Sequence, residues 1–322
     1  MNIALFGNFT ETQLRALQLA CPSGYRLITA GKNEWEKVKE ADYICCRGVS
    51  FTAETFEKLP KLKFISKWGV GYNKIDIQSA GLHHIPVSVC IGGNAEPVAE
   101  LTVALILDVL RGICKADREL KAHAGWERDA IGNKAYLLHG KKVGLIGFGN
   151  IAKKVAKILI HGFGCETSYY DVVRASDDVE KSFPIQFKPL ESLMKESDVV
   201  SIHVPLMEST AGMINARLLS MMKPTSILVN TARGGVVDEK ALIQKLKEKA
   251  ILGAGLDSYE EEPLPRDAKI LQLDNVVTTP HIGGTTVDND GNMAQICMKN
   301  VIDFDRTGDM SARAIINQQY LK

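Results

Sequence analysis

The chain has 322 residues, and its 39 Lys and Arg against 38 Asp and Glu give a net charge of +1 with neutral histidines. This length predicts about two domains. A charge so balanced offers no general field that would bind nucleic acid or an anionic membrane. The longest apolar run, residues 98–110, contains Glu100 and Asp108 and is too short to span a bilayer.

Seven cysteines are scattered along the chain without a C-x-x-C pair. This pattern is typical of reduced thiols, and it predicts neither a disulfide framework nor a metal site. The first strand candidate begins at residue 3, and no signal peptide precedes it. We therefore expect a cytoplasmic protein.

The first part of the chain alternates between strand-like and helix-like runs. Residues 12–19 and 54–59 have helical character, and the strand candidates are residues 3–6, 26–28, 43–46, 64–66 and 87–90. Such alternation predicts a parallel sheet covered by helices. No glycine fingerprint follows the first strand, so this part is a small α/β domain without a nucleotide loop of its own.

Two loops of this domain follow strand candidates, where ligands gather in open parallel sheets. In residues 67–73 (KWGVGYN), the amides of Val70 and Gly71 could bind a carboxylate, or the segment could be a plain tight turn. Arg47 follows another strand and is either a substrate contact or a solvated surface charge. Spacing alone leaves these alternatives open.

A long apolar helix marks the end of this domain. Residues 92–94 (GGN) interrupt regular secondary structure, and Pro97 is well placed in the first turn of the helix that follows. Because residues 98–110 are apolar nearly all round, we expect this helix to be buried between elements or subunits. We place the domain boundary after residue 97.

The strongest motif is a glycine loop after the short apolar run at residues 143–146. It reads Gly147-x-Gly149-x-x-Ala152 and leads into a helical pattern. Gly147 allows the tight turn, Gly149 lets the backbone approach a pyrophosphate, and Ala152 lets the helix pack on the strand. The helix N-terminus then attracts the anion.

A second strand-like run, residues 166–170, ends at Asp171, where an acid is expected to meet a ribose hydroxyl. The alternative is a glycine turn followed by an ordinary aspartate. Because strand, helix, strand and acid occur in order, the pattern favours dinucleotide binding. Asp171 also favours NAD over NADP, and Arg174 is the one residue that could weaken this preference.

Further strands follow, and polar residues stand at their ends. These strand candidates are residues 198–204, 226–230, 251–256 and 276–279, which lead to Pro205, Thr231, Asp257 and His281 respectively. The pattern predicts a doubly wound parallel sheet. A last helix near residues 292–304 and the run at 314–316 are expected to return to the first domain.

Arg233, Glu262 and His281 have complementary chemistry near these strand ends. An arginine pairs bidentately with a carboxylate, and a histidine exchanges a proton near neutral pH. A glutamate beside it would orient the ring and favour its charged form. Each residue also has an ordinary interpretation: an arginine in a glycine turn, a surface glutamate and a hydrogen-bonded histidine.

The chain resembles the D-isomer-specific 2-hydroxyacid dehydrogenases over nearly its whole length. The matching stretches are residues 67–71 (KWGVG), 94–100 (NAEPVAE), the glycine loop with Asp171, 203–206 (HVPL), 230–235 (NTARGG), 256–257 (LD) with 261–263 (EEP), and 279–284 (TPHIGG). The resemblance implies that Arg233 holds the substrate, Glu262 supports the histidine and His281 is the acid/base.

The resemblance also implies the contacts of substrate and cofactor. The substrate would be bound by Val70, Gly71, Asn94 and Arg233. The cofactor NAD would be bound by Gly147, Gly149, Asn150, Ile151, Asp171, His203, Val204, Pro205, Thr210, Thr231, Ala232, Asp257, His281 and Gly283, with Asp257 at the nicotinamide carboxamide. Members of the family are usually dimers joined through the cofactor domain, which would suit the apolar helix from residue 98.

Some positions depart from the family pattern. Met207 stands where a threonine often follows Pro-Leu, Tyr72 and Asn73 replace a more usual acidic position, and Glu96 is unusual in its loop. These departures leave the identity of the substrate open and the reaction type untouched. By resemblance, Arg47 and Lys67 would suit a phosphorylated substrate such as 3-phosphoglycerate.

Taken together, we expect an α/β protein of two doubly wound parallel-sheet domains with an active site in the cleft between them. A flavodoxin-like substrate domain would comprise residues 1–97 and a return segment at 288–322, and a Rossmann NAD-binding domain residues 98–287. The enzyme would transfer a hydride between NAD(H) and C2 of a small D-2-hydroxy or 2-oxo acid, such as glyoxylate or hydroxypyruvate.

Two other functions would be compatible with parts of this sequence. An NAD-sensing binding protein with vestigial catalysis is the alternative, and the presence of all three residues Arg233, Glu262 and His281 argues against it. A nucleic-acid binder would need a basic stripe, which the sequence lacks. The expected partners are a small acid and a second copy of the chain, with neither nucleic acid nor a membrane.

Overall fold

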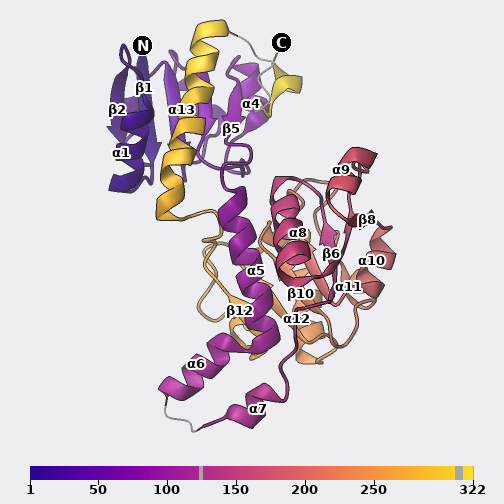
Figure 1. Ribbon diagram of the computed structural model, residues 1–322. Helices are drawn as coiled ribbons and strands as arrows, with labels where there is room; N and C mark the ends of the chain where they lie inside the picture. Colours follow the sequence, from indigo (N-terminus) through magenta and orange to yellow (C-terminus); the bar gives the residue numbers. More distant parts are fainter. Residues whose placement is uncertain (123–125, 309–314, 322) are drawn as a thin grey trace. The chain divides into compact units, whose positions relative to one another are not determined.

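The computed structural model describes residues 1–122, 126–308 and 315–321, and the chain forms two compact units (Figure 1). Unit 1 comprises Met1–Asn94 and Thr285–Lys322, and unit 2 comprises Ala95–Gly284. The chain crosses between the units after residues 94 and 284, whereas the sequence placed the boundaries after residues 97 and 287.

Unit 1 contains a five-stranded parallel sheet in the order β2-β1-β3-β4-β5. This is the strand order of flavodoxin-like folds, so the predicted architecture is confirmed. The strands are β1 (Asn2–Gly7), β2 (Arg26–Ala30), β3 (Tyr43–Arg47), β4 (Phe64–Lys67) and β5 (Val87–Val89), each within two residues of its predicted bounds.

Helices cover both faces of this sheet because its side chains alternate between two cores. On β4, Phe64 belongs to a core shared with α13, and Ile65 belongs to a core shared with α3 and α4. The helices of unit 1 are α1 (Glu11–Ala20), α2 (Trp35–Val38), α3 (Ala53–Glu57), α4 (Ile77–Leu82) and α13 (Asp290–Thr307), with short 3₁₀ turns η3 (Val287–Asn289) and η4 (Gln318–Tyr320).

The C-terminal segment returns to unit 1, as predicted. Ile315 pairs antiparallel with Ser88, and the Ile316 amide donates to the carbonyl oxygen of Val87 at 2.9 Å. Ala314, the first residue of the predicted run, lies outside the described residues. Asn317 is fully buried, accepts from the Val87 amide at 2.9 Å and donates to the carbonyl oxygens of Ile77 and Ile85.

Unit 2 contains a seven-stranded parallel sheet in the order β12-β11-β10-β9-β6-β7-β8. The strand order reverses between β6 and β9, as in Rossmann folds, which confirms the predicted NAD-binding architecture. The strands are β6 (Lys142–Ile146), β7 (Glu166–Tyr170), β8 (Ile185–Phe187), β9 (Val199–Ile202), β10 (Ile227–Asn230), β11 (Gly253–Leu256) and β12 (Val276–Thr278).

Two further cores lie on the two faces of this sheet. The core with α5 and α8 includes Leu105 and Leu159, and the core with α10, α11 and α12 includes Leu193 and Leu242. The elements are α5 (Ala95–Arg111), α6 (Ile113–Lys121), α7 (Arg128–Gly132), α8 (Asn150–Phe163), α9 (Asp177–Ser182), α10 (Leu190–Glu196), α11 (Ala216–Leu219) and α12 (Glu239–Lys247), with η1 (Gly234–Val236) and η2 (Lys269–Gln272).

The predicted apolar helix is α5, and ten of its side chains are buried. Pro97 lies in its first turn, as predicted. Glu96 forms an ion pair with Lys154 of α8. Among the described residues, no helix is long and apolar enough to cross a membrane.

The substitution Asn317→Ala should destabilise unit 1. It leaves one amide and two carbonyl oxygens without their buried partner, and a buried polar group without a partner costs about 1–3 kcal/mol. We expect the free energy of unfolding to fall by about 2–4 kcal/mol, measured by urea titration of tryptophan fluorescence. Gln319→Ala, at an exposed position two residues on, is the control, and equal stability of the two variants would contradict the prediction.

Candidate active site

The glycine loop joins β6 to α8 at the reversal of strand order in unit 2. Gly147 has φ +91°, and a Cβ at this residue would lie 2.9 Å from the backbone of His203. Only glycine fits this conformation and this close approach. A Cβ at Gly149 would meet nothing within 4 Å. The backbone at Gly149 is therefore open to a ligand.

The start of α8 and the end of β7 complete an anion-binding edge. α8 begins at Asn150 without a side-chain cap, so the amides of Asn150 and Ile151 are available to an anion. Asp171 accepts a hydrogen bond from the Phe148 amide through Oδ2 at 2.8 Å. Its Oδ1 has no hydrogen-bond partner in the described part of the chain. Asp171 thus holds the glycine loop and keeps an acceptor for a ribose hydroxyl, which fits a dinucleotide.

The turn after β9 continues this edge. Burial lowers the pKa of His203 to about 3, and its Nε2 lies 2.9 Å from Ser201 Oγ, so the ring is neutral at neutral pH. The Thr210 hydroxyl accepts from the Met207 amide at 2.8 Å and donates to the carbonyl oxygen of Pro205 at 2.6 Å. Thr210 therefore closes the turn that begins at Val204 and Pro205.

Arg233 follows β10 in a turn that Asn230 closes with its side chain. The Asn230 amide group donates to the carbonyl oxygen of Arg233 at 2.9 Å and accepts from the Ala232 amide at 3.0 Å. Thr231 is buried and shares a hydrogen bond of 2.8 Å with Thr102 of α5. Arg233 Nη1 donates to the carbonyl oxygen of Ala232, and the guanidinium has further donors to offer a substrate.

A close backbone approach brings the Arg233 turn to the loop after β11. A Cβ at Gly234 would lie 1.8 Å from the carbonyl carbon of Tyr259. Any side chain here would force the two loops apart. The Tyr259 amide donates to Glu262 Oε1 at 3.1 Å, which fixes this carboxylate beside the turn. The residues Arg233 and Glu262 are thereby brought together.

Tyr259 also ties this loop to the end of β12. Its hydroxyl lies 3.0 Å from the carbonyl oxygen of Leu256 and 2.9 Å from that of Thr279. His281 follows with φ +54° and places Nδ1 2.7 Å from Glu262 Oε2. Both side chains are more than one third exposed in this unit, so a substrate can reach them.

The carboxylate of Asp257 holds the segment that carries His281. Oδ1 accepts from the Thr279 hydroxyl at 2.7 Å and the Ile282 amide at 2.8 Å, and Oδ2 accepts from the Gly283 amide at 2.8 Å. Asp257 is 2 % exposed. Three hydrogen bonds therefore bind the residues on both sides of His281 to one buried carboxylate. Its predicted contact with the nicotinamide stays a prediction.

Burial, hydrogen bonds and neighbouring charges together determine the ionisation of Glu262 and Arg233. Burial by itself would raise the pKa of Glu262, but hydrogen bonds from His281 and the Tyr259 amide and the charge of Arg233 outweigh it, so the pKa is lowered. Burial lowers the pKa of Arg233, and the charge of Glu262 opposes this effect. Glu262 is therefore ionised at neutral pH.

The remaining candidates belong to unit 1. In the described residues, no amide from 69 to 72 donates a hydrogen bond within the protein, so those of Val70 and Gly71 are free for a ligand. Burial lowers the pKa of Lys67, whose Nζ donates to the carbonyl oxygen of Trp68. Arg47 donates to the carbonyl oxygen of Asn8 and to Gln13 Oε1. The roles of these residues and of Asn94 stay predictions.

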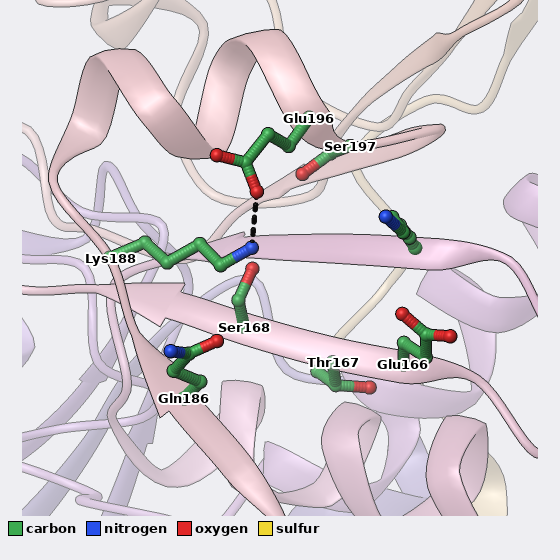
Figure 2. A pocket seen from close by; sticks show the side chains of 8 residues that line it. Glu166, Thr167, Ser168, Gln186, Lys188, Glu196 and Ser197 are labelled. Carbon is green, nitrogen blue, oxygen red and sulfur yellow. Dashed lines mark hydrogen bonds and ion pairs between the residues drawn. The ribbon is translucent and has the colours of Figure 1, made fainter.

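A separate pocket of about 80 Å³ lies where β6 and β7 begin, at the opposite ends of the strands from Asp171. Figure 2 shows its polar lining, with Lys188 paired to Glu196. It is far smaller than the clefts of about 300–1,000 Å³ that hold small-molecule ligands. The pocket is not a candidate for the dinucleotide.

Comparison with known proteins identifies the family. The model of the D-isomer specific 2-hydroxyacid dehydrogenase NAD binding domain matches residues 103–283. A glyoxylate reductase of Korarchaeum cryptofilum is 39% identical over 291 residues, which are 89% of this chain and 86% of that protein. A hydroxypyruvate reductase of Thermotoga maritima is 42% identical over 262 residues, 80% of this chain and 83% of that protein.

A solved structure shares both units. The NAD-complexed form of a D-isomer specific 2-hydroxyacid dehydrogenase from Lactobacillus delbrueckii ssp. bulgaricus aligns with a TM-score of 0.80 and 26% identity, over 98% of this chain and all of that one. The chain belongs to the D-isomer-specific 2-hydroxyacid dehydrogenase family. This dehydrogenase binds NAD and transfers a hydride between the nicotinamide and C2 of a 2-hydroxy or 2-oxo acid. The alternative of an NAD-sensing protein gains no support from the relatives.

Three residues that shape the site were not predicted to act there. Asn230, Tyr259 and Thr279 hold the loops of the dehydrogenase together through the hydrogen bonds given above. Asn230 and Thr279 stand inside runs that match the family, which was the only available signal. Tyr259 bonds to two strand ends that are distant in sequence from each other, and no local pattern indicates that.

The substitution Asp257→Asn should loosen the segment around His281. An asparagine has one acceptor oxygen, so at least one of the three donors loses its partner, which costs about 1–3 kcal/mol. We expect a lower melting temperature and a lower kcat. Asp267→Asn, which changes an exposed aspartate in the same unit, is the matched control. Unchanged melting and turnover in Asp257→Asn would show that the carboxylate is dispensable.

Proposed function

We propose that Arg233, Glu262 and His281 carry the reaction of this dehydrogenase, with the reduction of a small 2-oxo acid as its working direction. The observation behind this proposal is the 2.7 Å contact between His281 Nδ1 and Glu262 beside the charge of Arg233. This arrangement provides a proton donor, a group that orients it and a carboxylate-binding guanidinium.

The histidine has a defined orientation in this proposal. An ionised carboxylate can only accept hydrogen bonds, so His281 donates Nδ1–H to Glu262 and turns Nε2 toward the substrate. In reduction, Nε2 of the imidazolium gives its proton to the carbonyl oxygen on C2. In oxidation, neutral Nε2 takes the proton of the hydroxyl group. Bound NAD(H) supplies or accepts the hydride.

Arg233 binds the substrate carboxylate. Its remaining N–H groups form a planar fork suited to two carboxylate oxygens. Binding the carboxylate fixes C2 with its carbonyl oxygen toward His281, and the guanidinium charge stabilises the negative charge that develops on that oxygen. Asp171 and the amides of Asn150 and Ile151 bind the ribose and the pyrophosphate of NAD.

The relatives point to the substrate class. The matched proteins are named glyoxylate reductase and hydroxypyruvate reductase, and we propose these small 2-oxo acids as substrates of this chain. The test is a set of 2-oxo acids of increasing size assayed with NADH. Turnover highest with glyoxylate or hydroxypyruvate supports the proposal, and turnover with none of the acids overturns it.

The dehydrogenase is also proposed to work as a homodimer in the cytoplasm. Ile113, Leu120, Trp126 and Leu137, which follow one another in the stretch of chain after α5, are each more than half exposed. An exposed apolar patch marks an interaction site, and we propose that these four residues form one. The seven cysteines form no disulfide, which favours a reducing compartment.

The substitution Leu120→Glu together with Trp126→Glu should yield a folded monomer, because each places a charge where the interface would be apolar. Light scattering measures the mass of wild type and variant. Val172→Glu with Val173→Glu, which changes two other exposed apolar residues of the same unit, is the control and should stay dimeric. A monomeric wild type would contradict the proposal.

The substitution Glu262→Gln should shift the pH profiles of both directions. The lowered pKa of Glu262 keeps its carboxylate charged at neutral pH, and this charge lies 2.7 Å from the His281 ring. A negative charge so close stabilises a positive charge. Without that charge, the high-pH limb of reduction and the low-pH limb of oxidation should both move to lower pH in kcat/KM. If the limbs stay in place, Glu262 is not the partner of His281.

The substitution His281→Ala should reduce turnover by roughly a hundredfold or more at every pH, the usual contribution of a positioned acid/base. NADH binding, measured by fluorescence, should survive because His281 is not expected to touch the pyrophosphate or ribose. A variant that keeps most of its activity would remove His281 from the mechanism.

A further inference from the structure

Arg174 stands three residues after Asp171, on the segment that leaves β7 at the proposed cofactor edge. In dinucleotide-binding folds, an arginine near this position accommodates the 2′-phosphate of NADP. Here the guanidinium has another partner. Arg174 Nε donates to Glu180 Oε1 at 2.9 Å, and Nη2 donates to Glu180 Oε2 at 2.8 Å.

Glu180, in α9, is itself held in place. Tyr169 of β7 donates its hydroxyl hydrogen to Oε1 at 2.6 Å, and the Tyr169 oxygen accepts from the Ala175 amide at 2.9 Å. The Glu180 side chain is 14% exposed, against 60% for Arg174. The hydrogen bonds from Arg174 and Tyr169 lower the pKa of Glu180 to about 2, so the pair is ionised throughout the neutral range.

The ring of Phe187 supports the same position of Arg174. The guanidinium carbon lies over this ring, 5.7 Å from its centroid. Phe187 packs edge-on against Tyr169, with ring centroids 5.5 Å apart. Two fork-like hydrogen bonds and an aromatic face thus hold a side chain that would otherwise be free in solvent.

We propose that Glu180 is a specificity-determining residue for the dinucleotide, because it holds Arg174 in a bidentate pair and so keeps it from binding a 2′-phosphate. Asp171 repels that phosphate, and Glu180 withholds a nearby cation that would offset the repulsion. Glu180 acts through Arg174 and is not a catalytic residue. The inference rests on the proposed contact of Asp171 with the ribose.

The test compares wild type with Glu180→Gln, which keeps an acceptor for the Tyr169 hydroxyl and removes the charge. The kcat/KM ratio of NADPH to NADH should rise about three- to tenfold, the effect of one exposed ionic contact. Adenosine 2′,5′-bisphosphate should bind more tightly by the same factor in calorimetry, whereas adenosine 5′-monophosphate should bind as before. The gain should shrink at high salt.

Two further variants show whether Arg174 carries the effect. The double variant Glu180→Gln with Arg174→Ala should return the ratio to that of wild type. Glu196→Gln breaks another glutamate ion pair of unit 2, with Lys188, in which Arg174 takes no part (Figure 2). It should leave the ratio unchanged, which excludes a general effect of lost negative charge.

The proposal is overturned if Glu180→Gln leaves both the ratio and bisphosphate binding unchanged, or if the double variant keeps the gain. A separate measurement tests the proposed contact of Asp171 with the ribose. If that contact does not exist, the Asp171→Ala variant should bind adenosine 5′-monophosphate as tightly as wild type does. Because calorimetry needs no turnover, both results are independent of the catalytic roles proposed above.

Discussion

Arg233, Glu262 and His281 stand on three different loops, and they meet because hydrogen bonds tie those loops to one another at the ends of β10, β11 and β12. The Tyr259 hydroxyl joins the carbonyl oxygens of Leu256 and Thr279. Gly234 has no side chain and therefore lets the Arg233 turn lie directly against the backbone of Tyr259. Without these contacts the side chains of the three proposed catalytic residues would have no fixed separation.

Such a set of buried polar contacts is stable only when it is complete. Asp257 is almost fully buried, and its carboxylate would be costly there without donors. The Thr279 hydroxyl and the amides of Ile282 and Gly283 supply them. The same bonds satisfy amides in a segment that belongs to no helix or strand. His281, the proposed acid/base, thus stands on a loop that is held in place because the polar groups around it pair with one another.

The sequence predicted the architecture well because parallel sheets have strong local signals. The short apolar runs became strands, and polar residues such as Asp171 and Asp257 follow them at one edge of the sheet. The glycine loop could be predicted because Gly147 and Gly149 are required by the local backbone conformation, which depends on few neighbouring residues. Short elements such as β8 and α9 carry too few residues for a periodic pattern, and they were not foreseen.

Side-chain pairing was harder to foresee than position. The resemblance to the family predicted that Glu262 supports His281. The hydrogen bond by which Tyr259 holds the two loops together could not be predicted, because Tyr259 and Thr279 are about twenty residues apart along the chain. The partner of Arg174 could not be predicted from the sequence either, because the turn into α9 is what brings Glu180 to it. Contacts of this kind follow from the fold and not from spacing.

Arg174 and Arg233, both in unit 2, use the same side-chain chemistry in different ways. Arg174 is 60% exposed and uses its fork on Glu180, so its charge is matched within the protein. Arg233 is partly buried and donates one hydrogen bond to a backbone carbonyl oxygen, with no carboxylate within ion-pair distance among the described residues. A partly buried guanidinium without a direct counter-ion is costly unless an anion arrives to complete it. The free donors of Arg233 therefore support its proposed role in binding the substrate carboxylate, and the pairing of Arg174 with Glu180 supports the proposed exclusion of a 2′-phosphate.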